Sequence, residues 1–147
     1  MILRPATPAD ADEVAALFSA SRGLLTFLPP LHTLAEDRNF IVHHVMSECL
    51  VTIAERDGTI AGFIAETPGW IEHLYVAPDA VGSGIGPALL DAAKSRQSQI
   101  ELWCFAANKR GRAFYERHGF VAVERTDGAR NEEKLPDIRY RWVTAEA

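Results

Sequence analysis

The chain has 147 residues, of which 48% are hydrophobic, and a formal net charge of −5 at pH 7. This length fits one domain with its own core, and the composition excludes a disordered protein. The acidic charge argues against a nucleic-acid-binding protein, which neutralises phosphates with Lys and Arg. No apolar run approaches the roughly 20 residues of a membrane span, so we expect no membrane partner.

The first third of the chain predicts one strand and two helices. A short strand over 2–5 is followed by a helix that begins at Thr7, a capping residue, and ends near Gly23. An apolar, proline-containing connection over 24–31 leads to a second helix over 34–46, where apolar residues recur at helical spacing.

The middle of the chain predicts three strands, over 50–55, 59–66 and 70–76. The dipeptide Asp57-Gly58 between the first two is typical of a two-residue hairpin turn. The rest of the chain predicts a helix over 84–96, a strand over 100–104, a helix over 109–118, a strand over 119–125, a long polar loop over 126–136 and a last strand over 138–143.

Three glycines separate the predicted strand 70–76 from the helix that follows it. They stand at Gly82, Gly84 and Gly86, and glycine lets the backbone adopt positive φ and approach a ligand closely. Free N–H groups at a helix N-terminus bind phosphate or diphosphate groups. The spacing G-x-G-x-G differs from the dinucleotide fingerprint, and no Lys-Ser/Thr follows as in a P-loop.

Two blocks of sequence resemble the GNAT family of acyl-CoA N-acyltransferases. The segment 81–86 is similar to the family signature Arg/Gln-x-x-Gly-x-Gly/Ala, with Val81 where the family has Arg or Gln. The segment 108–120 is similar to the later motif Asn-x-x-Ala-x-x-Phe-Tyr-x-x-x-Gly-Phe, with its alanine shifted to Ala113. The two blocks stand in the family's order, and the resemblance covers nearly the whole chain.

The resemblance implies one acyl-CoA N-acyltransferase domain over residues 1–147. The implied fold is α/β, with a mixed, mostly antiparallel sheet of about seven strands that is splayed between the fourth and fifth strands. Its element order is β-α-α-β-β-β-α-β-α-β-β. The turn residues and the hydrophobic periodicity of this chain predict the same order.

The resemblance also implies acetyl-CoA as a co-substrate. Asn108 is expected either to bind the pantetheine amides or simply to cap its helix. The backbone of the predicted strand is expected to contact the pantetheine arm at Leu74, Tyr75 and Val76. The backbone of the glycine segment is expected to contact the diphosphate at Val81, Gly82, Ser83, Gly84, Ile85 and Gly86.

Tyr115 is the expected catalytic proton donor, because the family's Phe-Tyr tyrosine lies near the coenzyme sulfur and a phenol with a pKa near ~10 stays protonated at neutral pH. Glu72 is the expected base, since strand alternation places it on the face of Leu74 unless a bulge intervenes. His73 is the rival base. Like Tyr75, it is expected to face the other side and pack on a helix.

Further residues are expected to line an acceptor pocket together with Glu72: Phe27, Leu28, His32, Glu132 and Glu133. For Glu132 and Glu133 the alternative is a surface loop that carries solvated charge.

The cysteines Cys49 and Cys104 follow no metal-ligand spacing, so we expect no bound metal. Cys104 is expected to be a small buried side chain rather than a nucleophile. The residues at the N-terminus do not have the pattern of a signal peptide, and we expect a cytoplasmic protein.

The sequence thus predicts an N-acetyltransferase that transfers acetyl from acetyl-CoA to a primary amine of a small molecule by direct attack in a ternary complex. A protein N-terminal or lysine acetyltransferase is one alternative, and a CoA-binding regulatory module without activity is another. No nucleic-acid partner is expected, and a homodimer is left open.

Overall fold

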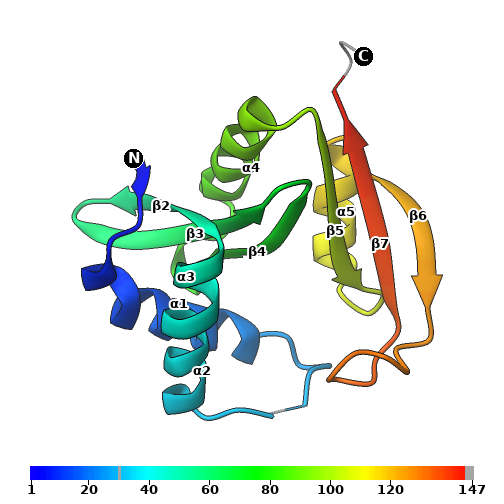
Figure 1. Ribbon diagram of the computed structural model, residues 1–147, viewed down its shortest axis with the longest axis horizontal. Helices are drawn as coiled ribbons and strands as arrows, with labels where there is room; N and C mark the ends of the chain where they lie inside the picture. The colour runs from blue at the N-terminus through cyan, green and yellow to red at the C-terminus, as the bar shows by residue number, and fades with distance from the viewer. Residues whose placement is uncertain (30, 145–147) are drawn as a thin grey trace.

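The computed structural model describes residues 1–29 and 31–144, so Pro30, in the predicted connection between the first two helices, lies outside the described residues. Its strands are β1 (Ile2–Pro5), β2 (Leu50–Arg56), β3 (Thr59–Thr67), β4 (Trp70–Val76), β5 (Gln99–Phe105), β6 (Val121–Thr126) and β7 (Asp137–Val143). They form a seven-stranded sheet in the order β1-β2-β3-β4-β5-β7-β6 (Figure 1). Among the described residues, only β4 and β5 pair in parallel, which confirms the predicted mixed, mostly antiparallel sheet.

The helices occur where the sequence predicts them. They are α1 (Ala11–Gly23), α2 (Leu34–Phe40), α3 (Met46–Glu48), α4 (Ile85–Arg96) and α5 (Lys109–Arg117). Short 3₁₀ turns, Pro8–Asp10 and Pro78–Ala80, precede α1 and α4. Asp57 and Gly58 have φ values of 53° and 77°, as a two-residue hairpin turn requires.

The predicted second helix differs from a single regular helix. A π-helical turn, Ile41–Val45, separates α2 from α3, although the backbone stays helical throughout. Ile41 and Val45 are both buried, so the irregular turn still keeps its apolar side against the sheet. Periodicity located the helix but could not reveal the π turn, which is a local change of hydrogen bonding.

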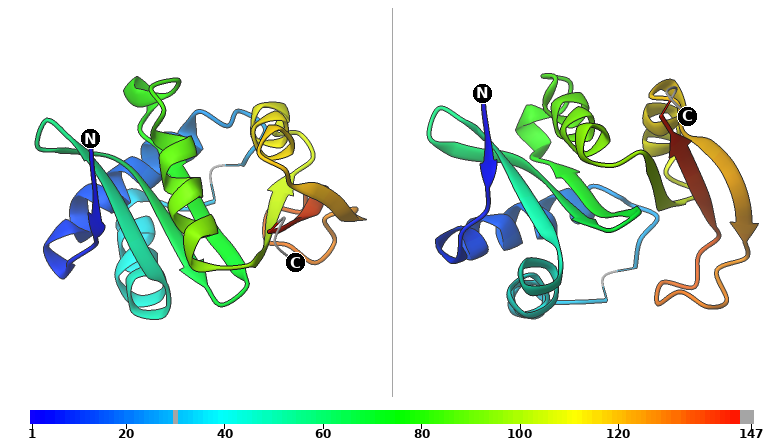
Figure 2. Two further views of the ribbon diagram at one scale, coloured as in Figure 1. Left: turned by 90° about the horizontal axis from the view of Figure 1, so that it is seen from above. Right: turned by 45° about the horizontal axis from the view of Figure 1, so that its top comes forward.

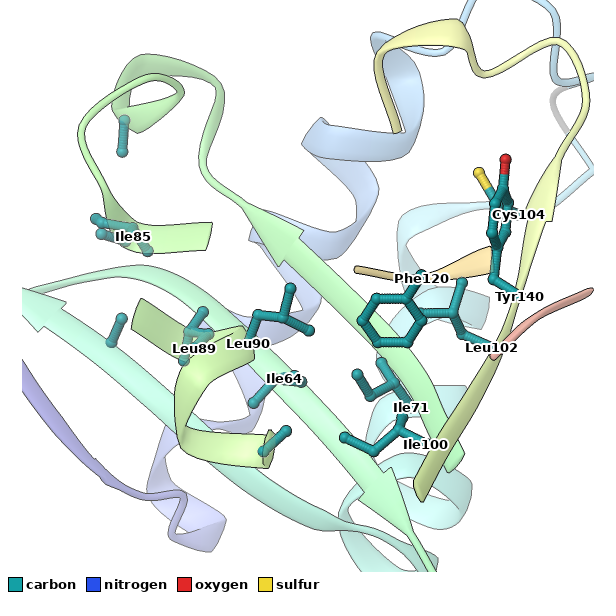
Figure 3. Close-up of a cluster of buried hydrophobic side chains, with 14 of the residues drawn as sticks. Ile64, Ile71, Ile85, Leu89, Leu90, Ile100, Leu102, Cys104, Phe120 and Tyr140 are labelled. Atoms are coloured by element: carbon teal, nitrogen blue, oxygen red, sulfur yellow. The ribbon is translucent and has the colours of Figure 1, made fainter. Parts of the chain in front are cut away.

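Helices cover both faces of the sheet (Figures 1 and 2). Residues of α1 and of the segment 40–46 pack on one face of β2 and β3, around Phe18, Ile53 and Phe63. On the other face, α4 contributes Leu89 and Leu90 to a second core that extends to residues of β5 and β7 (Figure 3). This second core therefore joins the two parts of the sheet, β1–β4 and β5–β7.

Candidate active site

The glycine segment after β4 forms a loop that ends in the N-terminus of α4. Gly82 and Gly84 have φ values of 87° and 88°, so both occupy the left-handed region that favours glycine, and Gly84 is the residue before the first turn of α4. Among the described residues, the backbone N–H groups of Gly82, Gly84, Ile85 and Gly86 have no hydrogen-bond partner. The loop therefore presents free donors at the positive end of a helix dipole.

Gly62 of β3 sets the position of this loop. A Cβ at Gly62 would lie 2.9 Å from Ile85 Cγ2, 3.0 Å from the Tyr75 carbonyl oxygen and 3.2 Å from Leu89 Cδ1. Only glycine lets α4 approach the sheet this closely. Sequence reasoning missed Gly62, since a glycine inside a strand does not reveal which helix will lie above it.

The two halves of the sheet part beside β4. The pairing of β4 with β5 is confined to Trp70 and Glu101, so β4 has a free edge beyond that point. This confirms the predicted splay between the fourth and fifth strands (Figure 1).

The antiparallel ladder decides which backbone groups face the gap. The Ala77 N–H donates to the Ala61 carbonyl at 2.8 Å, and hydrogen-bonded pairs recur at every second residue of the ladder. The N–H and C=O groups of Leu74 and Val76 therefore point into the gap, whereas those of Tyr75 point to β3. The Ser21 hydroxyl of α1 donates to the Val76 carbonyl at 3.0 Å and closes one end of this edge.

Tyr115 of α5 lies close to Cys104 and Tyr75. It packs against Phe114, Phe120 and Tyr140, and its hydroxyl has no hydrogen-bond partner within residues 1–29 and 31–144. Burial raises the pKa of this hydroxyl above its ordinary value, and Cys104 and Tyr75 raise it further. Tyr115 is therefore a protonated phenol with a free O–H at neutral pH.

Asn108 precedes α5 and acts as its cap. Its side-chain oxygen accepts a hydrogen bond from the Gly111 N–H at 2.9 Å. A Cβ at position 111 would lie 2.6 Å from the Asn108 amide nitrogen, so the glycine makes room for the cap. This side-chain oxygen is thus engaged within the helix terminus.

Cys104 is buried, as predicted. It belongs to the core that α4, β5 and β7 share (Figure 3). Burial raises the pKa of the thiol to about 11, so it is protonated at neutral pH and is a poor nucleophile.

A β-bulge separates Glu72 from the alternation of β4. His73 pairs with Ala65 and Ile71 with Glu66, which leaves Glu72 as the extra residue. Its side chain is exposed and accepts a hydrogen bond from the Thr67 hydroxyl at 2.8 Å. The alternation that would place Glu72 on the face of Leu74 is therefore broken, and the intervening bulge is the reason.

His73 and Tyr75 face α1 and α2, as the sequence predicts. The His73 ring lies 5.8 Å from Phe18 and 5.5 Å from Phe40, both edge-on. Burial, with a smaller effect of the Arg22 charge, lowers the pKa of His73 to about 4. The imidazole is consequently neutral at pH 7.

A cavity of about 610 Å³ opens on this face, and His73 contributes to its wall. Its rim joins the α1–α2 connection to the loop between β6 and β7. His32 lies 2.6 Å from Glu132 across this rim, and Arg22 donates to Glu133 at 3.1 Å. The cavity is lined by Phe18, Arg22, His32, Ala35, Glu36, Asp37, Asn39, Phe40, His44, His73, Glu132 and Glu133.

The structure thus brings His32, Glu132 and Glu133 together around one cavity but leaves out the other predicted lining residues. Phe27 packs edge-on to Phe105 at 5.9 Å, and Leu28 lines a neighbouring cavity of about 420 Å³. Glu72 lines neither of these two cavities.

Sequence reasoning missed Arg22, Asp37, Phe18 and Phe40 of the cavity wall. Their spacing along the two helices indicates only ordinary core and surface positions, not a cavity wall.

The loop over residues 127–136 is held by hydrogen bonds within the loop. The Asn131 side-chain amide donates to the Leu135 carbonyl at 2.7 Å and accepts from the Leu135 N–H at 3.2 Å.

Comparisons with known proteins agree with this geometry. Residues 47–122 match the model of the family described as "Acetyltransferase (GNAT) domain". Peptidyl-lysine N-acetyltransferase YiaC of Escherichia coli (strain K12) is 32% identical over 89 residues, which are 60% of this chain and 60% of that protein. The match therefore spans less than two thirds of the relative's length.

Solved structures share the fold over almost the whole chain. A GCN5-related N-acetyltransferase from Rhodopseudomonas palustris is 26% identical with a TM-score of 0.78, covering 97% of this chain and 95% of that one. PaiA N-acetyltransferase from Thermoplasma acidophilum, solved in complex with coenzyme A, is 20% identical with a TM-score of 0.74, covering 97% and 98%. The chain belongs to the GNAT acetyltransferase family.

Neither a membrane-spanning helix nor a metal-binding cluster occurs in the described part of the chain. No helix within residues 1–29 and 31–144 is long and apolar enough to cross a membrane. No group of three or more His, Cys, Asp or Glu side chains in those residues is arranged to hold a metal ion.

Proposed function

We propose that the protein is an acetyl-CoA-dependent N-acetyltransferase, formed as one domain over residues 1–147, that acetylates a primary amine of a small molecule. The observation that carries this proposal is the free edge of β4 beside the glycine loop. The backbone groups of Leu74 and the N–H of Val76 point into the gap, whereas the Val76 carbonyl accepts from Ser21. The N–H groups of Gly82, Gly84, Ile85 and Gly86, at the N-terminus of α4, have no partner among the described residues. An extended pantetheine arm and a diphosphate fit these two sets of donors and acceptors.

The reaction needs a proton for the departing thiolate, and Tyr115 is the proposed donor. Its O–H is free, and the raised pKa keeps it protonated until the thiolate forms. Because the Cys104 thiol is also held protonated, we propose direct attack by the amine in a ternary complex rather than an acetylated cysteine.

We propose two candidates, Glu72 and His73, for the base that removes the amine proton. Glu72 lies on the bulge of β4, exposed to solvent, whereas His73 lines the cavity. Glu72→Gln should shift the pH profile of kcat/KM to higher pH if Glu72 is the base, and a superimposable profile would leave His73 or a water molecule.

The proposal is tested by an amine panel with acetyl-CoA and a reading of free thiol. Thiol release that depends on a small-molecule amine supports the proposal. Coenzyme binding by calorimetry without thiol release on any amine would instead leave a regulatory CoA-binding module.

A peptidyl-lysine acceptor is the second candidate, favoured by the similarity to the E. coli peptidyl-lysine N-acetyltransferase. Lysine-containing peptides therefore belong in the same panel. Turnover of these peptides with no turnover of small amines would select this candidate.

A further inference from the structure

The cavity on the α1–α2 face carries more negative than positive charge. Its lining includes four carboxylates and one guanidinium. Glu133 is paired with Arg22 at 3.1 Å, and His32 lies 2.6 Å from Glu132 and 3.7 Å from Glu36. The fourth carboxylate belongs to Asp37.

Asp37 is the carboxylate of this cavity without a cationic partner among the described residues. It lies in the first turn of α2, is partly buried, and is held by the Ser19 hydroxyl of α1, which donates to it. Burial raises the pKa of the Tyr75 hydroxyl, Arg22 lowers it, and Glu133 and Asp37 raise it again. Asp37 is thus close enough to the β4 side of the cavity for its charge to act there.

One wall of this cavity is aromatic. Phe18 and Phe40 lie 6.0 Å apart, and the neutral His73 ring stands edge-on to both. Such walls suit a methylene chain, and aromatic faces attract an ammonium group. The combination of an apolar wall and a fixed, unpaired carboxylate is complementary to an alkyl chain that ends in a cation.

The amine that attacks the thioester must be neutral, so the negative charge of the cavity cannot serve it in its reactive form. We propose that Asp37 binds a second, non-reacting ammonium group of the acceptor and makes the enzyme selective for small diamines. This inference rests on the proposed N-acetyltransferase function and names the substrate class of that site. Asp37 is a specificity-determining residue in this account.

The test compares diaminopentane with aminopentane, each with its amino groups at the chain ends. The wild type should show a kcat/KM for the diamine about tenfold or more above that for the monoamine, as expected for a charge-assisted hydrogen bond. Asp37→Asn should reduce this ratio to about one, and Ser19→Ala should reduce it in part by releasing the carboxylate.

Asp12→Asn is the matched control. Asp12 is exposed on α1 and pairs with Arg38 of α2, so this variant also removes a charged contact between the two helices but lies outside the cavity. Its diamine-to-monoamine ratio should equal that of the wild type. Thermal unfolding of all variants separates a loss of selectivity from a loss of folded protein.

An unchanged ratio in Asp37→Asn, or a wild type without preference for the diamine, overturns the inference. Release of thiol with aminopentane in that case leaves the proposed acetyltransferase function intact. If neither amine releases thiol, calorimetric titration of diaminopentane into the CoA-bound protein decides the matter. Binding that Asp37→Asn abolishes supports the inference, and no binding to the wild type overturns it.

Discussion

At the scale of single residues, the account depends most on Tyr115, whose hydroxyl is free while its ring is packed in the core. Tyr115→Phe removes only the oxygen, so we expect kcat to fall about 10²-fold, as for loss of a general acid. The dissociation constant for acetyl-CoA, measured by calorimetry, should stay within about twofold of the wild type.

Tyr140→Phe provides the control. The Tyr140 hydroxyl donates to Glu116 at 2.6 Å, so its loss should lower the free energy of unfolding by about 1 kcal/mol and spare kcat. Equal kcat values for wild type and Tyr115→Phe would remove the proposed role of Tyr115.

Val81 occupies the position where the family signature has Arg or Gln, and its side chain is 40% exposed. Val81→Arg should add a charge-assisted contact to the coenzyme diphosphate and tighten acetyl-CoA binding about tenfold, or ~1.4 kcal/mol, at low salt. The gain should shrink as ionic strength rises. Val123→Arg places the same charge at an equally exposed site on β6, and binding as tight as that of Val81→Arg would contradict a local contact.

His73 links the pH of the solution to stability. Its pKa is about 4 in the folded protein and 6.5 when unperturbed, so between these values the unfolded state binds more protons. Stability contributed by the neutral ring is therefore present above pH 6.5 and lost as the pH falls toward 4.

Denaturant unfolding measures this effect. Between pH 7 and pH 5 the wild type should lose about 2 kcal/mol of unfolding free energy through His73. His73→Phe keeps an aromatic ring between Phe18 and Phe40 but cannot titrate, so its loss over the same interval should be smaller by that amount. Equal losses of unfolding free energy between pH 7 and pH 5 in the wild type and His73→Phe would contradict this prediction. They would show that the ring is accessible to protons in the folded state.

At the scale of elements, the approach of α4 to β3 fixes where the glycine loop lies. Gly62→Ala should push α4 outward, because a Cβ there would lie 2.9 Å from Ile85. We expect a loss of about 1–3 kcal/mol in unfolding free energy and weaker acetyl-CoA binding in the folded fraction.

Gly23→Ala is the matched variant, since a Cβ at Gly23 would meet no atom within 4 Å. It should leave the unfolding free energy and the free energy of acetyl-CoA binding within about 1 kcal/mol of the wild-type values. Wild-type coenzyme affinity and stability in Gly62→Ala would show that the close approach does not position the loop.

The elements themselves could be predicted because their signals are local. Proline and glycine mark the ends of the helices, and the Asp57-Gly58 turn has the positive φ values that this dipeptide favours. Departures arise where two elements interact. The bulge at Glu72 depends on the register of β3 against β4, and alternation within one strand cannot reveal it.

At the scale of the whole molecule, the candidate site consists of segments that are far apart in sequence. His32 and Glu132 are 100 residues apart and meet at 2.6 Å, and Arg22 and Glu133 are 111 residues apart. The sequence named three of these four side chains as candidates but could not pair them. Arg22 was missed because an arginine near the end of a helix is also an ordinary terminal residue.

The splay of the sheet connects these parts. It leaves β4 with a free edge, with the glycine loop and α4 on one side and the cavity at His73 on the other. In the proposed function, a coenzyme tail along this edge would reach the cavity at His73 through the gap in the sheet. The motifs of the family indicated the gap, whereas the charges of the cavity became visible only in three dimensions.

The most direct test of this arrangement is a crystal structure of the protein with acetyl-CoA. Our account predicts the diphosphate on the free N–H groups of Gly82, Gly84, Ile85 and Gly86. It places the pantetheine arm along Leu74 and Val76, and the thioester within reach of the Tyr115 hydroxyl. A coenzyme bound elsewhere, or a β5 strand that pairs along the whole of β4 and fills the gap, would contradict it.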